Sequence, residues 1–282
     1  MNKLINGSDY SKTVLSRLKK EVSVLRKKRI IPQLAIVQVG SDKASNIYVS
    51  KKIKAAENIG VKGTLYSFSS KTSEKKLLGL INKLNNNKKV HGIIVQLPLP
   101  KHINKLKIIN SVSSEKDVDG FTYFNLGKTA QNEKVLVSAT PKACMALLEK
   151  YKVNLKGAHC VIINDSVIVG KPLAMLLLNE GATVTVCNKF TKNLSAKTRQ
   201  ADILFSAVGK PNFIKSSMVK KGFIGIDIGI VHLKNNKVVG DFAFNSLKKK
   251  AKLITPVPGG VGPMTVAMLL ENTVLAAKQQ AK

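Results

Sequence analysis

Two periods of hydrophobic and polar residues follow one another in the first part of the chain. Residues 10–29 place Val14, Leu18, Val22 and Leu25 on one stripe with lysines opposite, which predicts an amphipathic helix. The patterns that follow predict a strand at 33–39, a helix at 45–59, a strand at 63–68, a helix at 73–84 and a strand at 92–96. Short apolar strands that alternate with helices predict parallel pairing with right-handed crossovers.

The alternation resumes after Pro141, a residue that suits the first position of a helix. It predicts strands at 159–163, 183–187, 202–207 and 224–228, with a loop at 164–170 and a helix at 171–179 between the first two. A loop rich in proline and glycine at 254–265 then leads into an apolar helix that ends near Ala277. The second half therefore predicts another doubly wound α/β unit.

The predicted helix at 45–59 carries a charged residue on its apolar face. At 100° per residue, that face comprises Ser45, Tyr48, Val49, Lys52, Ala55, Ala56 and Ile59. Burying an ammonium without a partner costs several kcal/mol or lowers its pKa, and a lowered pKa makes an amine an acid/base group. The alternative is that Lys52 extends its ammonium to water while its methylene groups lie along the alanines.

Composition narrows the class of protein. The 282 residues are 44% hydrophobic and form one or two domains, without an apolar run of about 18 residues and without the apolar core of a signal peptide. We therefore expect a soluble, cytoplasmic protein. Cys144, Cys160 and Cys187 lie among apolar or small residues without metal-ligand spacing, so we expect buried free thiols and neither a disulfide nor zinc.

The formal net charge of +31 raises the hypothesis of a nucleic-acid or polyanion binder. The basic residues are nevertheless spread along the whole chain, and nearly all of them are lysines, whereas arginine is the preferred residue for contacts with bases and phosphates. Compositional bias explains such a lysine-rich surface better. The charge would also attract an anionic substrate.

Polar residues stand at two further places in the first half. Gln96 ends a predicted strand just before Leu97-Pro98, where its amide could hold a lysine or simply cap the strand. Asp117 and Asp119 lie two residues apart in a turn-prone stretch, and no third ligand follows at a metal spacing. We expect a carboxylate that hydrogen-bonds an amine-bearing heterocycle rather than a metal site.

The loop at 164–170 predicts a dinucleotide site, because backbone amides at the start of a helix after a strand bind pyrophosphate. The usual G-x-G-x-x-G is missing, and Asn164 occupies the first glycine position. Asparagine tolerates positive φ, so we expect the turn to survive. No acid ends the second strand to bind a ribose hydroxyl, but Lys189 could accept a ribose phosphate.

These stretches together resemble the bifunctional methylenetetrahydrofolate dehydrogenase/methenyltetrahydrofolate cyclohydrolase family. The resemblance covers nearly the whole chain, and its motifs occur in the order of the family. They are Ser45-Asn46-Ile47-Tyr48 with Lys52, Gly92 to Pro100, Lys116 to Phe121, Ser166 to Pro172 and Thr255 to Thr265.

The resemblance implies an α/β fold with two domains: an amino-terminal folate domain and a Rossmann-type doubly wound dinucleotide-binding domain. The folate domain would comprise residues 1–138, with 265–282 forming a helix that packs back on it, and the dinucleotide domain residues 139–264. The active cleft would lie between them. A homodimer through the dinucleotide domain is implied as well.

The resemblance also assigns roles. Lys52 matches the catalytic lysine, Tyr48 the ring that stacks on the substrate, Gln96 the residue that positions the lysine, and Asp119 the carboxylate that holds the pterin. The remaining substrate-binding positions are Val95, Leu97, Pro258, Gly259 and Gly260. The cofactor-binding positions are Asn164, Asp165, Ser166, Ile168, Val169, Gly170, Pro172, Lys189, Ala207, Val208, Gly209, Ile230, Gly259, Gly260, Val261 and Thr265, and no metal is implied.

The implied activity oxidises methylenetetrahydrofolate with NADP and hydrolyses the methenyl product to formyltetrahydrofolate, a step of one-carbon metabolism that serves purine biosynthesis. One departure concerns the cofactor: Asp165 stands where the family commonly has an arginine for the phosphate of NADP. NAD is therefore the alternative cofactor, and a cyclohydrolase with weakened dehydrogenase activity is the nearest rival function. A dehydrogenase for another substrate is less consistent with Tyr48, Lys52, Gln96 and Asp119.

Overall fold

The computed structural model describes residues 4–40, 42–233 and 237–281, with the backbone alone for residues 43 and 44. The chain divides into two compact units. The three-stranded unit comprises Thr13–Lys128, Lys134–Ala139 and Val266–Lys282. The five-stranded unit comprises Met1–Lys12, Thr129–Glu133 and Thr140–Thr265.

The sheet of the three-stranded unit has the order β2-β1-β3, and both pairings are parallel, as the sequence predicts. Its strands are β1 (Gln33–Val39), β2 (Lys62–Phe68) and β3 (Gly92–Val95). The crossovers contain α2 (Lys43–Asn58) and α3 (Glu74–Asn86), and the Ser73 hydroxyl caps α3 by accepting from the Lys76 amide. The central strand β1 is buried along nearly its whole length, which explains its continuous apolar run.

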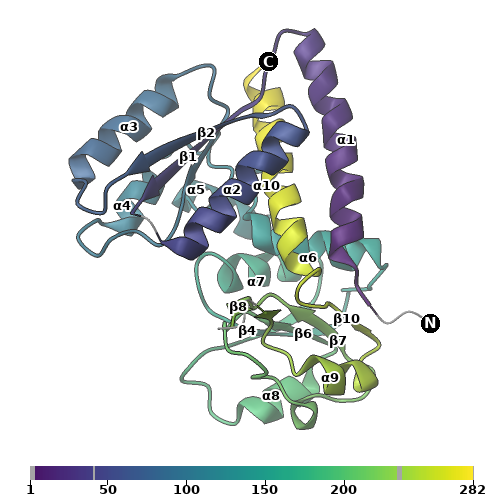
Figure 1. Ribbon diagram of the computed structural model, residues 1–282. Coiled ribbons are helices and arrows are strands. Elements are labelled where there is room, and N and C mark those ends of the chain that lie inside the picture. Colours follow the sequence, from purple (N-terminus) through teal and green to yellow (C-terminus); the bar gives the residue numbers. More distant parts are fainter. Residues whose placement is uncertain (1–3, 41, 234–236, 282) are drawn as a thin grey trace. The chain divides into compact units, whose positions relative to one another are not determined.

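The sheet of this unit is covered on both faces (Figure 1). One face packs Ala35, Val37 and Val39 of β1 against apolar side chains of α3 and of the short helix α4 (Lys105–Asn110). Residues at the alternate positions Leu34 and Ile36 are also fully buried, on the opposite face. Parallel strands therefore end at one edge of a well-packed sheet.

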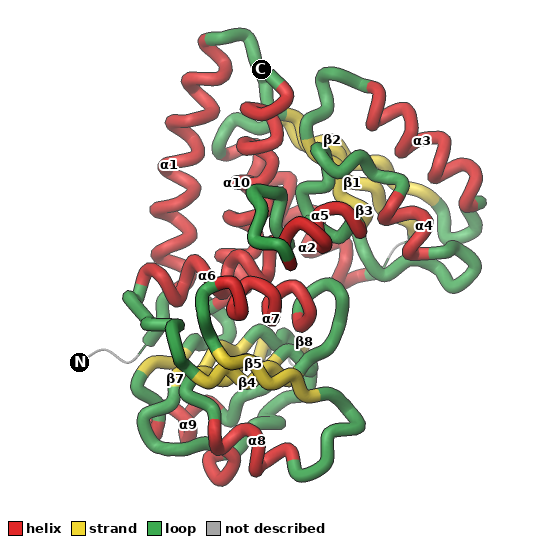
Figure 2. Tube along the Cα trace, turned by 180° about the vertical axis from the view of Figure 1, so that it is seen from behind, coloured by secondary structure: helices red, strands yellow, loops and turns green. Residues whose placement is uncertain are grey.

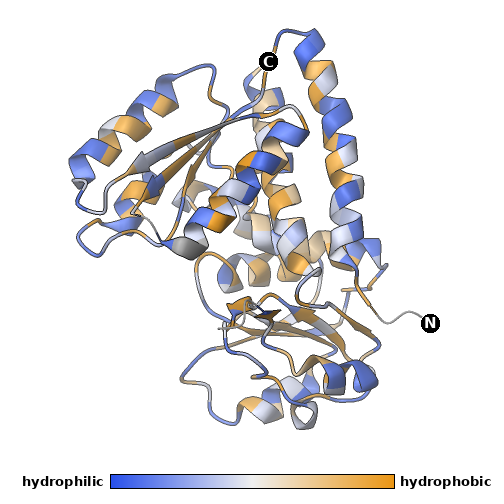
Figure 3. Cartoon of the chain, viewed as in Figure 1, coloured by the Kyte–Doolittle hydropathy of each residue, from blue (hydrophilic) through white to orange (hydrophobic). Residues whose placement is uncertain are grey.

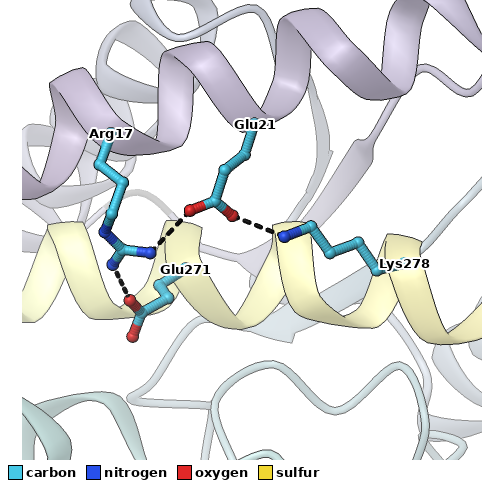
Figure 4. Close-up of polar contacts among 4 residues, drawn as sticks. All are labelled: Arg17, Glu21, Glu271 and Lys278. Atoms are coloured by element: carbon cyan, nitrogen blue, oxygen red, sulfur yellow. Dashed lines mark hydrogen bonds and ion pairs between the residues drawn. The ribbon is translucent and has the colours of Figure 1, made fainter.

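The long helices α1 (Gly7–Lys27) and α10 (Val261–Gln280) lie side by side, and from Thr13 and Val266 onward they belong to the three-stranded unit. The predicted apolar stripe of α1 is buried, and Figure 3 shows hydrophilic residues alternating with it along the helix. Ion pairs link the exposed edges of the helices: Arg17 contacts Glu21 and Glu271, and Glu21 also contacts Lys278 (Figure 4). Each exposed pair adds at most about 1 kcal/mol, so apolar burial is the main stabilising contribution. The predicted return of the last helix to the first domain is thus confirmed.

The five-stranded unit contains a wholly parallel sheet of order β10-β7-β6-β4-β5, the Rossmann-type arrangement that the sequence predicts. The strands are β4 (His159–Ile163), β5 (Thr183–Cys187), β6 (Ile203–Ser206), β7 (Ile224–Asp227) and β10 (Leu253–Ile254). Helices α6 (Ala139–Lys150) and α7 (Gly170–Asn179) cover one face, and α8 (Leu194–Gln200) and α9 (Phe244–Lys250) cover the other (Figure 2).

Some elements differ from the sequence prediction. Helix α10 begins at Val261, so Thr265 lies in its second turn rather than in the preceding loop. Pro141 is the third residue of α6 rather than the first. The short elements not predicted are α4, α5 (Tyr123–Ala130), α8, α9, β10, the 3-10 turn Ser216–Met218, and the antiparallel hairpin β8 (Val231–His232) and β9 (Val238–Val239). These segments are too short for a period to show.

The three cysteines are buried and free, as predicted, and burial raises the pKa of each thiol. Among the described residues, no group of histidine, cysteine, aspartate or glutamate side chains is arranged to hold a metal ion. None of the helices in the described part of the chain is long and apolar enough to cross a membrane.

Candidate active site

Helix α2 places Lys52 on its packed face. The side chain of Asp42 caps the helix by accepting from the Ser45 amide at 2.8 Å. Ser45, Val49, Ala56 and Ile59 are buried, Tyr48 and Lys52 are partly buried, and Lys51, Lys54, Glu57 and Asn58 are exposed. The predicted face is therefore confirmed, and Lys52 is the lysine on it.

Gln96 holds the Lys52 ammonium. Lys52 Nζ donates to Gln96 Oε1 at 3.1 Å, while Gln96 Nε2 donates to the Leu97 carbonyl at 2.8 Å. Since the amide nitrogen is engaged by that carbonyl, the amide oxygen must face the lysine. The Gln96 backbone amide also donates to the carbonyl of Val37 on β1 at 2.8 Å, which fixes Gln96 at the carboxyl edge of the sheet. The predicted pairing of the two residues is confirmed.

A second glutamine, missed in the sequence, fixes the start of α2. Gln38 is buried on β1, and its Nε2 donates to Asn46 Oδ1 at 2.6 Å. The carboxyl ends of β1 and β3 thus each carry a glutamine that contacts α2, one near its first turn and one at Lys52. Gln38 is an inward-pointing polar residue in an apolar strand, and that departure from the pattern was the available signal.

Asp119 lies close enough to Lys52 for their charges to interact. Burial raises the pKa of Asp119 to about 6, the Lys52 ammonium opposes the rise, and the Asp117 carboxylate adds to it. Burial also raises the pKa of the Tyr48 phenol, which keeps it protonated at neutral pH. The three-stranded unit thus brings an amine, an amide and a carboxyl group together, with an aromatic ring one helical turn from the amine.

Asp117 differs from Asp119 because it is buried within its own loop. Its Oδ2 accepts from the Thr122 amide at 2.8 Å and from Asn125 Nδ2 at 3.0 Å. The two carboxylates, alike in the sequence, therefore have different surroundings. Asp117 is bound within the turn, whereas the less completely buried Asp119 remains the predicted substrate ligand.

The turn that carries Asp119 is fixed by residues that the sequence did not single out. Lys116 Nζ donates to three backbone carbonyls, those of Leu84, Asn85 and Asn87, at 2.6–3.2 Å. Asn272 of α10 donates to the carbonyls of Val118 and Val137 at 2.9 and 2.7 Å. Only the folded chain brings these distant groups together.

In the five-stranded unit, the loop after β4 is organised by the side chain of Asn164. Its Oδ1 accepts from the Ser166 amide and hydroxyl and from the Gly170 amide at 2.6–3.0 Å, and its Nδ2 donates to the Ala207 carbonyl at 2.8 Å. Asn164 is not among the residues with positive φ. The expectation of a left-handed asparagine was therefore wrong: the turn survives because the side chain binds the loop amides.

Gly170 starts α7 against this loop. A Cβ atom there would lie 1.9 Å from the Asn164 carbonyl oxygen, so no larger residue fits without moving the backbone. The amides of Val169 and Gly170 donate to the Ser166 hydroxyl and to Asn164 Oδ1. Binding of a pyrophosphate at this helix start remains a prediction, because these amides already have acceptors in the loop.

Opposite charges stand near the carboxyl end of β5. The exposed carboxylate of Asp165 accepts from Asn188 Nδ2 at 3.1 Å, so the acid lies beside the residue that follows β5. Next along the chain, Lys189 Nζ lies 4.9 Å from the ring centroid of Phe190, which is 76% exposed. Both an anion and a cation are therefore available to a ribose at this edge.

The loop of Pro258 to Gly260 is held by the amino-terminal segment. The Ser8 amide donates to the Gly259 carbonyl at 2.9 Å, and a Cβ atom on Gly7 would lie 1.9 Å from the Gly260 oxygen. Gly259 has a φ of +103°, a backbone conformation that favours glycine. The glycines of this loop thus permit close backbone contact, here with the chain itself.

Two hollows of about 400 and 360 Å³ lie elsewhere in the five-stranded unit. The smaller one is lined by Ala158, Ile203, Ile224 and Leu253, which lie at or just before the starts of strands. Ligands of doubly wound sheets bind at the carboxyl ends of strands. Size alone therefore does not locate the site in this unit.

The fold is that of an α/β protein with a Rossmann-type sheet, the arrangement common in dinucleotide-binding proteins, in one unit and a lysine site in the other. The family model "Tetrahydrofolate dehydrogenase/cyclohydrolase, catalytic domain" matches residues 5–119, and the model of the NAD(P)-binding domain of the same family matches residues 138–281. The chain belongs to the tetrahydrofolate dehydrogenase/cyclohydrolase family, and the predicted resemblance is confirmed.

Individual relatives agree along the full length. The bifunctional protein FolD of Campylobacter jejuni is 49% identical over 278 residues, which cover 98% of this chain and 99% of the relative. A crystal structure of the C. jejuni enzyme has a TM-score of 0.96 at 47% identity and covers 98% of each chain. The Trypanosoma brucei enzyme, solved with NADP cofactor and inhibitor, has a TM-score of 0.95 at 34% identity and covers 99% of this chain and 98% of its own.

Proposed function

We propose that this protein is a bifunctional enzyme that oxidises methylenetetrahydrofolate with a nicotinamide dinucleotide and hydrolyses the methenyl product to formyltetrahydrofolate. The observation that carries the proposal is the hydrogen bond between Lys52 and Gln96 with Asp119 nearby, in a chain that belongs to this family. Its test is turnover of methylenetetrahydrofolate and of methenyltetrahydrofolate by the purified protein. A polyanion-binding function would leave this arrangement unexplained.

Hydrolysis begins with attack by water on the methenyl carbon, which carries positive charge shared with its ring nitrogens. In its unprotonated form the Lys52 amine takes a proton from the attacking water, and the Gln96 oxygen keeps the amine directed at that position. The hydroxyl group of this adduct then loses its proton as the formyl C=O forms and the carbon–nitrogen bond breaks. The departing nitrogen takes up one proton, so the proton accepted by Lys52 is the one released overall. Asp119 binds the amine-bearing edge of the pterin, and Tyr48 stacks on its ring.

Oxidation needs positioning more than acid or base chemistry, because a hydride leaves the methylene carbon and the resulting cation is stabilised by adjacent nitrogens. The bound nicotinamide supplies the hydride acceptor. The loops after β4, β6 and β7 would hold the dinucleotide, through Ser166, Ile168 and Val169 in the first and Val208, Gly209 and Ile230 in the others, together with Pro172 in the first turn of α7. Their place at the carboxyl ends of parallel strands fits such a ligand.

We propose NADP as the main cofactor and NAD as the alternative, with Asp165 and Lys189 deciding between them. Replacing Asp165 with alanine should raise kcat/KM for NADP about tenfold and change that for NAD little, because an anion that repels the ribose phosphate is removed. Lys189→Ala should lower kcat/KM for NADP and spare NAD. Steady-state kinetics with both cofactors measures each ratio.

The same kinetics separates this proposal from its rival, a cyclohydrolase with weakened dehydrogenase activity. Reduction of neither cofactor by the parental chain, with intact hydrolysis of added methenyltetrahydrofolate, would support the rival. Equal effects of Asp165→Ala on both cofactors would show that Asp165 does not sense the ribose phosphate. Lys192→Ala, which also removes the charge of a lysine after β5, is the matched control for Lys189→Ala.

The pKa of Asp119 predicts a pH dependence. The carboxyl ionises as pH rises through about 6, and only the ionised group accepts two hydrogen bonds from a pterin edge. We therefore expect KM for methenyltetrahydrofolate to fall as pH rises from about 5 to about 7, one unit on either side of this pKa. Asp119→Asn should have a raised KM without this slope.

Ionisation of Asp119 should favour substrate binding but lower the free energy of unfolding. Because the folded-state pKa lies above the ordinary value of 3.8, ionisation of Asp119 weakens the fold as pH rises through about 6. Asp119→Asn should therefore unfold at a higher temperature than the parent at pH 8 but not at pH 4, and calorimetry at both pH values measures this. For the kinetic prediction, an Asp119→Asn protein whose KM still falls between about pH 5 and pH 7 would contradict the role of Asp119 in binding the pterin.

We also propose a homodimer formed through the five-stranded unit. In the described sheet β5 pairs only with β4, which makes β5 an edge strand, and Val186 on it is 43% exposed. Exposed apolar edges are suited to association with a second copy. Sedimentation equilibrium should give twice the chain mass for the parent and the chain mass for Val186→Lys; a monomeric parent would refute the dimer.

A further inference from the structure

We propose that two buried carboxylates, Asp241 and Asp227, are positioning residues for the dehydrogenase reaction: they fix the loops after β6 and β7 in the conformation that binds the cofactor. The inference rests on the proposed function, since it takes these loops as the dinucleotide site. It adds two acids that neither the motifs of the sequence nor the predicted cofactor-binding positions include.

Asp241 is fully buried and binds the loop after β6. Its Oδ2 accepts from the Ser206 hydroxyl at 2.7 Å and from the Val208 amide at 2.6 Å, and its Oδ1 accepts from the Lys210 amide at 2.9 Å. The two amides flank Gly209, whose φ is +71°. The Asp241 carboxylate therefore accepts hydrogen bonds from the backbone on both sides of Gly209, the glycine that is predicted to approach the cofactor.

Asp227 ends β7 and binds the backbone around Asp241. Its Oδ1 accepts from the amides of Gly229 and Asp241 at 3.1 and 3.0 Å, and its Oδ2 accepts from the Phe242 amide at 2.9 Å. The Gly229 bond fixes the turn that leads to Ile230. The two acids thus form a chain of contacts from the loop after β7, through residues 241 and 242, to the loop after β6.

The fit around this pair excludes any side chain on the neighbouring glycines. A Cβ atom on Gly229 would lie 2.2 Å from an Asp241 oxygen, and one on Gly240 would lie 2.1 Å from an Asp227 oxygen. The segments 227–229 and 240–241 therefore pack closely against each other. The absence of a side chain on Gly229 leaves space for Asp241, and its absence on Gly240 leaves space for Asp227. Loops held this closely have little freedom to change shape.

The loop after β6 is fixed from its other side as well, because Asn164 Nδ2 donates to the Ala207 carbonyl. Asn164 and Asp241 hold successive residues of one loop from two directions. The geometry of Val208 and Gly209 therefore depends on an acceptor that only a carboxylate supplies, since three donors converge on Asp241. An amide in its place would turn an NH₂ group toward one of those donors.

The test is Asp241→Asn, a change of equal size. We expect the dissociation constant and KM of the nicotinamide cofactor to rise about tenfold to a hundredfold, the effect expected when hydrogen bonds to a charged group are lost. The rate of hydrolysis of methenyltetrahydrofolate should be unchanged, because Lys52, Gln96 and Asp119 belong to the other unit. Ser206→Ala, which removes one donor and leaves the carboxylate, should raise the same KM only a few-fold.

Asp202→Asn is the matched control. Asp202 is an exposed acid that directly precedes β6, at the edge of the sheet opposite the loop after β6, and it binds the His159 amide and Lys220. It should bind cofactor like the parent. An unchanged cofactor KM in Asp241→Asn, or equal losses of both activities, would overturn the inference. If Asp241→Asn does not fold, Ser206→Ala decides. A few-fold rise in its cofactor KM supports the inference, and an unchanged cofactor KM contradicts it. A parental chain that binds no dinucleotide would instead refute the proposed function.

Discussion

Lys52→Ala should abolish hydrolysis of methenyltetrahydrofolate while leaving cofactor reduction by methylenetetrahydrofolate largely intact. The loss should be about a hundredfold to ten-thousandfold, the range for removal of a positioned acid/base group. The reason is that hydrolysis requires a proton acceptor beside the attacking water, whereas hydride transfer does not. Parallel assays of both reactions on one preparation measure the difference.

Lys51→Ala is the control for this change, because Lys51 is exposed on the same helix and lies off the packed face. It should match the parent in both reactions. Folding should be little affected by Lys52→Ala, since the lysine is only partly buried and its hydrogen bond joins two side chains. A Lys52→Ala protein that hydrolyses methenyltetrahydrofolate at the parental rate would defeat the assignment.

Gly170→Ala should produce the opposite separation, with loss of the dehydrogenase reaction and retention of hydrolysis. The new Cβ atom would lie 1.9 Å from the Asn164 carbonyl oxygen, so the loop or the first turn of α7 must move. A displacement of about 1 Å at a positioning loop can lower activity about a hundredfold. Cofactor titration and kcat/KM for methylenetetrahydrofolate oxidation measure the loss.

Gly79→Ala is the matched control, because a Cβ atom at Gly79 in α3 meets no atom within 4 Å. An alanine there favours the helix by about 1 kcal/mol relative to glycine and should spare both reactions. Overpacking at Gly170 costs about 1–3 kcal/mol, so the variant should still fold. Unchanged cofactor binding in Gly170→Ala would show that this loop is not the dinucleotide site.

The sequence predicts the regular core of the fold well. The bounds of β1, β4 and β5 agree with the prediction residue for residue, because each is a short segment of strand-forming residues between turn residues. The short helices α4, α5, α8 and α9 escaped prediction. Each has only six to eight residues, which is about two turns and too few to establish a period.

The lysine site could be predicted in part from physical chemistry. A charge on an apolar face and an amide at a strand end both depart from the local pattern, and the fold joins them in one hydrogen bond. The roles of Asp117 and Asp119 could not be separated, since their difference arises from Thr122 and Asn125 and not from their own spacing. Family resemblance, rather than spacing, singled out Asp119.

The residues that hold the loops of the site, such as Asn272 and Asp241, could not be predicted because their partners are distant in the sequence. Asn272 binds carbonyls 135 and 154 positions away, and Asp241 binds amides 31 and 33 positions away. Such contacts leave no periodic trace in a single sequence. Asn164 shows a related limit: its identity suggested backbone tolerance, but its side chain proved to be the acceptor that organises the loop.

The most direct test of the central claim, that one chain carries out both reactions, follows methylenetetrahydrofolate incubated with the parental protein and NADP or, separately, NAD. We predict that reduced cofactor and formyltetrahydrofolate form in equal amounts with at least one cofactor, with little methenyltetrahydrofolate accumulating. Reduced cofactor that accumulates with methenyltetrahydrofolate hydrolysed only at its uncatalysed rate would contradict the role of Lys52. Absence of reduction with both cofactors would contradict the dehydrogenase function.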